Sequence, residues 1–437
     1  MRYNLTKLHA SYIILASVTI FPYLFVLIVN PYVPSNDETY QLQGAYRLAS
    51  KHEYSVTWSP PQDLSVPKYD YLTAWPPGYS VAISALLRSG LSLDFSAKAF
   101  KVSTLFLGLF LWFALADKFF PQAAPKFIFL LFLCVSSVYY AGSSTDLFLW
   151  ALMPAFSSLM LRMKEESQAK MKYEVEQLTL VLLSGLLASM MILMKYQGVA
   201  LIPVGLAWLM IVKRREIKSL MVQCLVFSFL PLLTLMGIAY TNILWSGSLS
   251  YHTRWEGSGF SWNVEWFRQM LEALALSPLH LNKAIPFVLH RFDLDPHQGL
   301  IAGGTALILV LAVGYAMSKA WKSTQATHDI TVWCSLSLFG LVCFLTLYTG
   351  HYFSPDNPEP PPMTNPRYYW SLVPLLFIAL LVSIFPKAAR TAEVKKPRKG
   401  MTIFILCVFL VGETGVTGYA LFKNSQFQNF HTNKRSA

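Results

Sequence analysis

Long apolar segments, separated by shorter polar ones, recur along the whole 437-residue chain. A helix that crosses a bilayer needs roughly 20 mainly apolar residues. The pattern therefore predicts an all-α polytopic membrane protein, and we treat residues 1–437 as a single integral membrane domain. Eleven spans are expected, at about residues 11–30, 97–116, 126–141, 146–161, 178–194, 198–212, 219–244, 299–318, 330–350, 368–386 and 401–422.

Residues 78–93, GYSVAISALLRSGLSL, are apolar enough to resemble one more span. They contain Arg88 and are followed at once by Asp94 and Lys98. We interpret this stretch as an amphipathic helix that lies at the membrane interface. The first outer loop, residues 31–96, would then carry interfacial helices.

The distribution of basic residues supports this topology. If the N-terminus is cytoplasmic, 20 of the 35 Lys and Arg residues fall in short cytoplasmic segments, as in most membrane proteins. Counting residues 78–93 as a span would move the basic segments 213–218 and 387–400 to the outer face. We therefore expect residues 387–400 to be a basic cytoplasmic linker and residues 245–298 to be a large outer loop. No cleavage site of the A-x-A type follows the first span, so it is expected to remain as a signal anchor in the cell or plasma membrane.

Composition excludes several other classes of protein. The chain is 54% hydrophobic and only 13% charged, whereas soluble domains have about 25% charged residues. The net charge of +12 follows the loops, so it does not indicate a nucleic-acid partner. All five cysteines lie in apolar segments, which argues against a disulfide framework or a cysteine metal site.

The first outer loop opens with Ser35-Asn36-Asp37-Glu38. Ser-x-x-Glu is the pattern of a capping box, in which Ser35 and Glu38 satisfy the first backbone amides of a helix. That structural explanation accounts for Glu38 but not for Asp37. A carboxylate at a helix N-terminus near the membrane surface is also suited to act as a general base. Both explanations remain open on local evidence.

Three further polar positions stand at predicted span ends, and each has an ordinary structural explanation. Asp146, in Ser143-Ser144-Thr145-Asp146, fits a helix start. Lys195 fits a side chain that extends from a helix end to the interface. Arg367, followed by Tyr368, is the single basic residue of its outer loop and fits an interfacial anchor.

Taken together, these motifs resemble the GT-C membrane glycosyltransferases. The resemblance rests on an apolar first span, the Asp37-Glu38 pair, Tyr40 in the helix that follows, and the aromatic stretch that ends in Trp75-Pro76-Pro77-Gly78-Tyr79. It is closest to the branch of protein O-mannosyltransferases and the aminoarabinose transferase of lipid A. Members of that branch carry a catalytic acid in the first outer loop, followed by two interfacial helices.

The resemblance implies roles for individual residues. Asp37, Glu38 and Asp146 would be catalytic acids that face one outer cavity. Lys195, Arg367 and Tyr368 would bind the phosphate of a lipid donor. Tyr40 and Trp75 are expected contacts of the sugar or the acceptor.

The large outer loop is less diagnostic. In residues 251–256, His252, Arg254 and Glu256 are candidate sugar or acceptor contacts, because charged side chains orient hydroxyl groups. Asp293, Asp295 and His297 have a spacing seen in metal loops, but a lone DxD is a weak signal and a solvated turn is the favoured explanation. We assign no metal ligands, and the dependence on a divalent cation stays open.

The sequence thus predicts a hexosyl- or pentosyltransferase that moves a sugar from a polyprenyl-phosphate donor to a lipid, glycan or protein acceptor, with inversion, at the outer membrane face. The alternatives are a lipid-linked saccharide flippase and a non-catalytic scaffold with the same fold. Transporters usually carry charges near the bilayer midplane. Here the predicted spans are almost uncharged and the polar groups lie in outer loops, which favours the enzyme.

Overall fold

The computed structural model describes residues 21–58 (without 22, 23, 26 and 33), 68–72, 74–120, 123–140, 143–168, 174–247, 264–276, 298–321, 325–352 and 366–385. Nearly all of these residues are helical. The elements before the bundle are α2 (Asn36–Lys51), β1 (Ser55–Trp58), β2 (Lys68–Tyr71) and α3 (Gly78–Arg88). The bundle and its connections follow as α4 (Leu93–Phe119), α5 (Ala123–Tyr140), α6 (Ser144–Gln168), α7 (Glu174–Met194), η1 (Tyr196–Ala200), α8 (Leu201–Lys213), α9 (Ile217–Ser246), α10 (Val264–Leu276), α12 (Gln298–Trp321), α13 (Gln325–Tyr352), η6 (Pro366–Tyr369) and α14 (Val373–Ile384).

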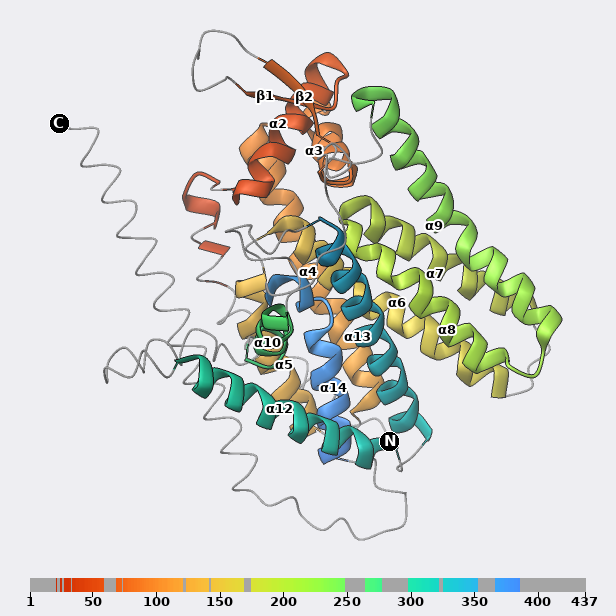
Figure 1. The fold of residues 1–437 in the computed structure, drawn as a ribbon. Helices are drawn as coiled ribbons and strands as arrows, with labels where there is room; N and C mark the ends of the chain where they lie inside the picture. The colour runs from red at the N-terminus through yellow and green to blue at the C-terminus, as the bar shows by residue number, and fades with distance from the viewer. Residues whose placement is uncertain are drawn as a thin grey trace.

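The long helices form a bundle (Figure 1). Large aromatic side chains lie in its core. Trp112 of α4 donates its indole N–H to the backbone oxygen of Trp150 in α6, at 2.9 Å. Trp208 of α8 and Trp333 of α13 meet edge to face, with ring centroids 5.4 Å apart. The indoles of Trp112, Trp208 and Trp333 are each buried, and each donates a hydrogen bond, as buried tryptophans usually require. The side chains therefore fix how α4, α6, α8 and α13 pack.

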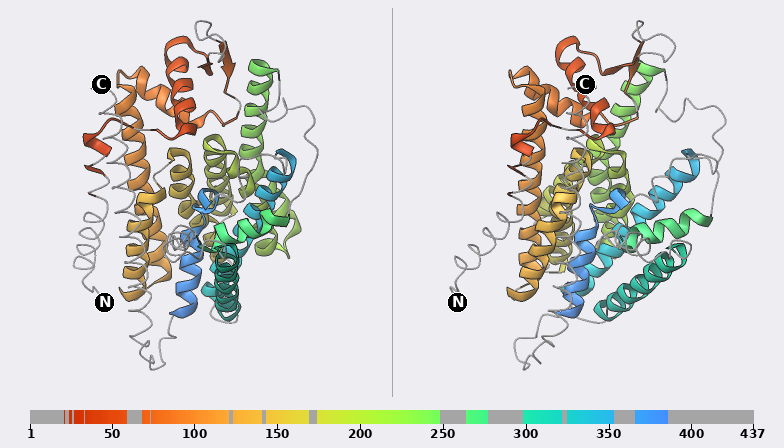
Figure 2. Two further views of the ribbon diagram at one scale, coloured as in Figure 1. Left: turned by 60° about the vertical axis from the view of Figure 1, so that its left-hand side comes forward. Right: turned by 90° about the vertical axis from the view of Figure 1, so that its left-hand side faces the viewer.

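Helices α2 and α3 lie together at one end of this bundle (Figures 1 and 2). Helix α2 packs on α3, and Ser80 of α3 donates a hydrogen bond to the backbone oxygen of Gln41 at 2.7 Å. In the sequence between α2 and α3, strands β1 and β2 form an antiparallel hairpin, in which Ser55 pairs with Tyr71 and Trp58 with Lys68. The sequence analysis did not predict this hairpin.

Helix α3 confirms the separate helix expected from residues 78–93. It has 11 residues, too few to cross a bilayer, and Gly90 with φ +92° breaks the chain before α4. At its start, a Cβ on Gly78 would stand 2.4 Å from the backbone oxygen of Leu193. Only glycine allows this approach, so the Pro-Pro-Gly sequence seats α3 against the end of α7, beside Lys195.

Helices occur at each predicted span between residues 97 and 386. Six of the described segments are long and apolar enough to cross a membrane, and they are Leu93–Phe119, Ser144–Lys164, Val175–Met194, Tyr196–Lys213, Ile217–Ser246 and His328–Thr349. The chain is therefore a polytopic, all-α membrane protein. Residues 401–422 lie outside the described residues, as does most of 11–30, so the number of eleven spans stays a prediction.

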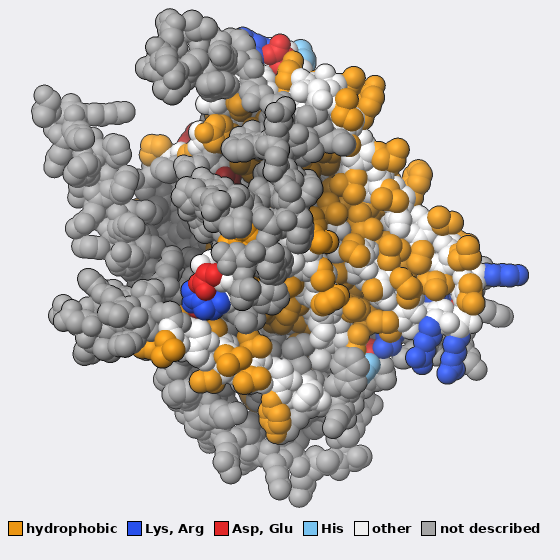
Figure 3. Space-filling model, in the orientation of Figure 1, with side chains coloured by type: hydrophobic (Ala, Val, Ile, Leu, Met, Phe, Trp, Pro, Cys, Tyr) orange, Lys and Arg blue, Asp and Glu red, His pale blue; other side chains and the backbone are white. Residues whose placement is uncertain are grey.

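The surface agrees with a lipid environment. Figure 3 shows hydrophobic side chains over the face formed by α7 and α9, where Leu225, Phe229 and Met236 are exposed. Basic side chains gather where α8 turns into α9, with Arg214 and Arg215 exposed. Helix α9 runs from this turn to Trp245, which packs on Tyr71 of the hairpin. Its 30 residues span about 45 Å, so the basic turn and the α2 end lie at opposite ends of the bundle.

Candidate active site

Asp37 lies in the first turn of α2 and forms an ion pair with Arg367 of η6. Their Oδ2 and Nη2 atoms are 2.9 Å apart, and each side chain keeps a little over a quarter of its surface exposed. The two residues are 330 positions apart in the sequence. The start of α2 and the segment before α14 therefore meet at one point, which is partly exposed at the protein surface.

A second ion pair lies beside the first but is buried. Lys195, between α7 and η1, contacts Oδ1 of Asp146 in the first turn of α6. Asp146 is 3% exposed, and its Oδ2 makes no hydrogen bond within the described part of the chain. Gly198 permits this turn, because a Cβ there would stand 2.5 Å from the backbone nitrogen of Ile192.

Tyr368 joins the two pairs. Lys195 Nζ lies 4.6 Å from the centre of its ring, and Arg367 Cζ lies 5.2 Å from it. Gln197 of η1 donates a hydrogen bond to the backbone oxygen of Tyr368 at 2.9 Å. Attraction between cations and the aromatic face holds both basic groups near one ring. Four segments thus place two carboxylates and two cations around a single tyrosine.

The charge of Arg367 is secured by this arrangement. Burial alone would lower the pKa of Arg367, but the Tyr368 side chain and the carboxylates of Asp146 and Asp37 raise it above its usual value. Guanidinium binds phosphate through two parallel hydrogen bonds. The site therefore presents a permanent cation suited to a phosphate, next to acids that could accept a proton.

Glu38 differs from its neighbour Asp37 in every contact. It is fully buried and completes the predicted capping box with Ser35. Its Oε1 accepts hydrogen bonds from the Ser144 amide at 2.7 Å and the Tyr32 hydroxyl at 3.0 Å, and Lys101 Nζ lies 3.5 Å away. Burial would raise the pKa of Glu38, but Lys101, Ser144 and Ser35 together hold it below its usual value. Glu38 is thus held inside the protein by contacts to three other residues, and the catalytic role assigned to it from sequence stays a prediction.

Of the residues predicted to contact the sugar or the acceptor, the structure describes Tyr40 and Trp75. Tyr40 stacks on Trp75, with ring centroids 5.9 Å apart and planes inclined by 16°. Tyr40 stands one helical turn beyond Asp37, so this aromatic pair flanks the site. His252, Arg254 and Glu256 lie outside the described residues, as do Asp293, Asp295 and His297. Among the residues that are described, no group of three or more His, Cys, Asp or Glu side chains could hold a metal ion.

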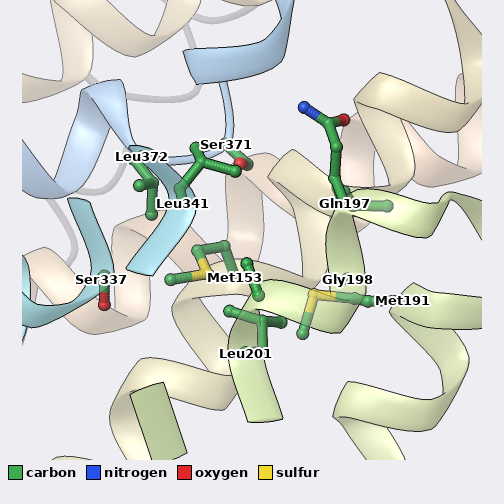
Figure 4. Close-up of a pocket in the computed structure, with 11 residues that line it drawn as sticks. Met153, Met191, Gln197, Gly198, Leu201, Ser337, Leu341, Ser371 and Leu372 are labelled. Carbon is green, nitrogen blue, oxygen red and sulfur yellow. The ribbon is translucent and has the colours of Figure 1, made fainter. Parts of the chain in front are cut away.

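A small pocket lies next to the ion pairs (Figure 4). Its lining is mainly apolar, with Leu149 one turn beyond Asp146 and Leu201 just after η1. Gln197 and Ser371 supply polar atoms at its rim. The recess is lined by residues that follow Asp146, Lys195 and Arg367 along the chain, but not by these charged residues themselves.

Comparison with solved structures identifies the architecture. The chain is similar to the crystal structure of ArnT from Cupriavidus metallidurans in the apo state, with a TM-score of 0.51, 15% sequence identity, and coverage of 91% of this chain and 62% of that one. The structure of ArnT bound to undecaprenyl phosphate matches with a TM-score of 0.51, 14% identity, and coverage of 96% and 72%. This chain shares the fold of these two ArnT structures. No protein-family profile and no curated protein matches the sequence.

The shared fold confirms the helical membrane architecture that the resemblance based on the Asp37-Glu38 and Pro-Pro-Gly motifs predicted. Four of the predicted site residues, Asp37, Asp146, Lys195 and Arg367, converge in it with Tyr368. Their chemical roles stay predictions.

Four residues that contact the candidate site were not predicted from the sequence, namely Tyr32, Lys101, Ser144 and Gln197. Lys101 could have been predicted, because it lies inside the predicted span 97–116 and ionisable residues within spans are candidates for functional residues. Ser144 donates its own backbone amide to Glu38, and Gln197 donates its side-chain amide to the backbone oxygen of Tyr368. Their sequence context gave no such indication.

Proposed function

We propose that this protein is a membrane glycosyltransferase that moves a sugar from a polyprenyl-phosphate donor to an acceptor hydroxyl. The observation that carries the proposal is the convergence of Asp37, Asp146, Lys195 and Arg367 on Tyr368 within a GT-C fold. A related fold was crystallised with undecaprenyl phosphate, and two cations beside an apolar recess suit a lipid phosphate of that kind.

In the proposed reaction the acceptor oxygen attacks the anomeric carbon from the side opposite the phosphate. The bond between that carbon and the phosphate oxygen breaks, and its electron pair leaves with the lipid phosphate. Lys195 and Arg367 would stabilise the departing anion, so no acid is needed to protonate it. Asp37 would take the proton from the acceptor hydroxyl. A single displacement of this kind inverts the configuration of the anomeric carbon.

The ion pairs add a condition to this reaction. Arg367 forms an ion pair with Asp37, and Lys195 with Asp146. A donor phosphate that binds both cations would compete with both carboxylates. Arrival of the donor would thus free Asp37 to act as a base, which favours binding of the donor before proton transfer.

The proposed orientation places this site at the outer membrane face. The exposed basic turn between α8 and α9 lies at the opposite end of the bundle, as expected for the cytoplasmic side. The N-terminus would then be cytoplasmic.

A deletion strain tests the proposal and addresses the sugar and the acceptor together. We expect mass spectrometry of its glycans to show the loss of one sugar substituent, which returns when the wild-type gene is restored. Membranes from the restored strain should transfer radiolabelled sugar from a panel of polyprenyl-phosphate pentoses and hexoses. Unchanged glycans in the deletion strain, with no transfer from any donor, would contradict the proposed function.

A further inference from the structure

The buried carboxylate of Glu38 contacts three segments that are distant in sequence. Its own helix, α2, carries Asp37 at the preceding position. Its Oε1 accepts the amide of Ser144 at the start of α6, two residues before Asp146. The Nζ atom of Lys101 in α4 lies 3.5 Å from the same oxygen. One side chain therefore connects the two acids of the proposed site.

Capping of α2 does not explain this arrangement. A capping box needs a carboxylate that returns to the N-cap amide, which Glu38 supplies with Oε2 bound to the Ser35 amide at 3.0 Å. The second oxygen, Oε1, takes no part in the capping box and instead accepts a hydrogen bond from the Ser144 amide of α6. Taking a carboxylate and an ammonium out of water is costly, and an apolar pair of similar volume is often as stable. The charges thus call for a reason other than stability.

Tyr32 strengthens the connection. Its hydroxyl donates to Glu38 Oε1, and Lys101 Nζ lies 4.7 Å from the centre of its ring. Its backbone amide donates to Asp94 Oδ1 at 2.7 Å, near the start of α4. The chain that enters α2 is thereby held to α4 at two points. Movement of α2 relative to α6 would break several of these contacts at once.

We propose that Glu38, with Lys101 as its counter-ion, is a positioning residue that sets the distance between Asp37 and Asp146. The inference rests on the proposed function, because it assigns these two acids to one reaction. Glu38 itself does not touch the donor or the acceptor, since it is fully buried and its two oxygens already have partners. Misplacing a reacting group by about 1 Å can cost on the order of 100-fold in rate.

Three variants test the inference by kinetics. Glu38→Gln keeps the shape but leaves Lys101 buried without its counter-charge, and Lys101→Met does the reverse. Each should lower kcat by about 100-fold while the KM for donor changes less than about threefold. The double variant Glu38→Gln/Lys101→Met removes both charges and should lose no more than either single variant. Multiplied losses in the double variant, or a wild-type kcat for Glu38→Gln, would overturn the proposal.

The control is Asp329→Asn, which removes one partner of the buried Lys164–Asp329 pair at the other end of α6. It should lower thermal stability without changing kcat. If Asp329→Asn lowers kcat as much as Glu38→Gln, the effect is general destabilisation and the positioning role is wrong. Should Glu38→Gln fail to fold, Glu38→Asp keeps the charge on a shorter side chain, and it too should lower kcat with little change in KM.

A distance measurement tests the same inference without activity. Spin labels at Tyr46 on α2 and Arg162 on α6, both exposed, report how firmly the helices are held, in a background with the native cysteines replaced. Glu38→Gln should broaden the distance distribution, and Asp329→Asn should leave it unchanged. Equal distributions in all variants would overturn the positioning role. If the distribution broadens but the wild type transfers no sugar, the positioning role stands and the proposed reaction falls.

Discussion

Helix α6 carries a buried ion pair at each end, and the two pairs differ in their surroundings. At its start, Asp146 contacts Lys195 in the company of a second cation, a second carboxylate and a tyrosine ring. Near its end, Lys164 contacts Asp329 at 2.5 Å, with the Trp208 ring and His328 as neighbours. Both pairs are almost fully enclosed by protein.

The difference shows that burial of a charge pair does not by itself mark a reactive site. The Lys164–Asp329 pair joins α6 to α13. At the Asp146 end, four segments meet around Tyr368. At the Asp146 end, polar atoms border an apolar recess and Asp37 stays partly exposed. What distinguishes the proposed site is that two carboxylates and two cations gather around one tyrosine ring, and that Asp37 and Arg367 are partly exposed.

Loss of Asp37 should have the largest effect. Asp37→Asn removes the proposed base but keeps the shape of the side chain, and general bases contribute roughly 100- to 10,000-fold to rate. Sugar transfer in membranes should therefore fall at least about 100-fold with expression unchanged. Asp329→Asn, tested beside it, should retain the wild-type rate. Wild-type transfer by Asp37→Asn would show that another group is the base.

Loss of either cation should weaken donor binding. A hydrogen bond to a charged group contributes about 1.5–3 kcal/mol, or roughly 10- to 150-fold in affinity. Lys195→Met and Arg367→Met should raise the KM for lipid donor within that range. Arg47→Met serves as control, because Arg47 pairs with Glu53 in the same outer region without joining the site. Unchanged donor kinetics in both site variants would remove these cations from the phosphate site.

The two ends of α6 should separate stability from activity. Removing one partner of a buried ion pair typically costs about 3–5 kcal/mol. Asp146→Asn and Asp329→Asn should both lower the melting temperature measured in detergent, and only Asp146→Asn should lower transfer beyond the loss of folded protein. Equal activity per folded molecule in the two variants would erase the distinction between the ends.

The aromatic pair should give the smallest effect. Aromatic contacts contribute about 0.5–1.5 kcal/mol beyond area burial, which corresponds to roughly two- to twelvefold in affinity. Trp75→Ala should raise the KM for acceptor within that range and leave the KM for donor unchanged. A rise in donor KM instead would place Trp75 on the donor side of the site.

Much of the fold was predictable because apolar length and loop charge are read along the chain. The spans from residue 97 to 386, the capping box at Ser35 and the separate helix after Pro77 all follow from local patterns. The β1–β2 hairpin was missed. Its strands have four residues each and depend on packing of Tyr54 and Tyr71 against the distant Trp245.

The site was predictable as residue types but not as pairs. Local patterns could not show that Arg367 meets Asp37 across 330 residues, or that Lys195 meets Asp146. Glu38 shows the limit most clearly. The cap explained one of its oxygens, whereas the other depends on Ser144 and Lys101, which tertiary packing brings to it.

A single-turnover assay with purified protein in vesicles tests the central claim most directly. The donor would be a polyprenyl-phosphate sugar with label in both the sugar and the lipid, and the acceptor would be supplied by extract of deletion-strain membranes. We predict that transferred sugar and free polyprenyl phosphate form in equal amounts, and that Asp37→Asn abolishes both. Movement of intact donor across the vesicle membrane without cleavage would contradict the account and identify a flippase.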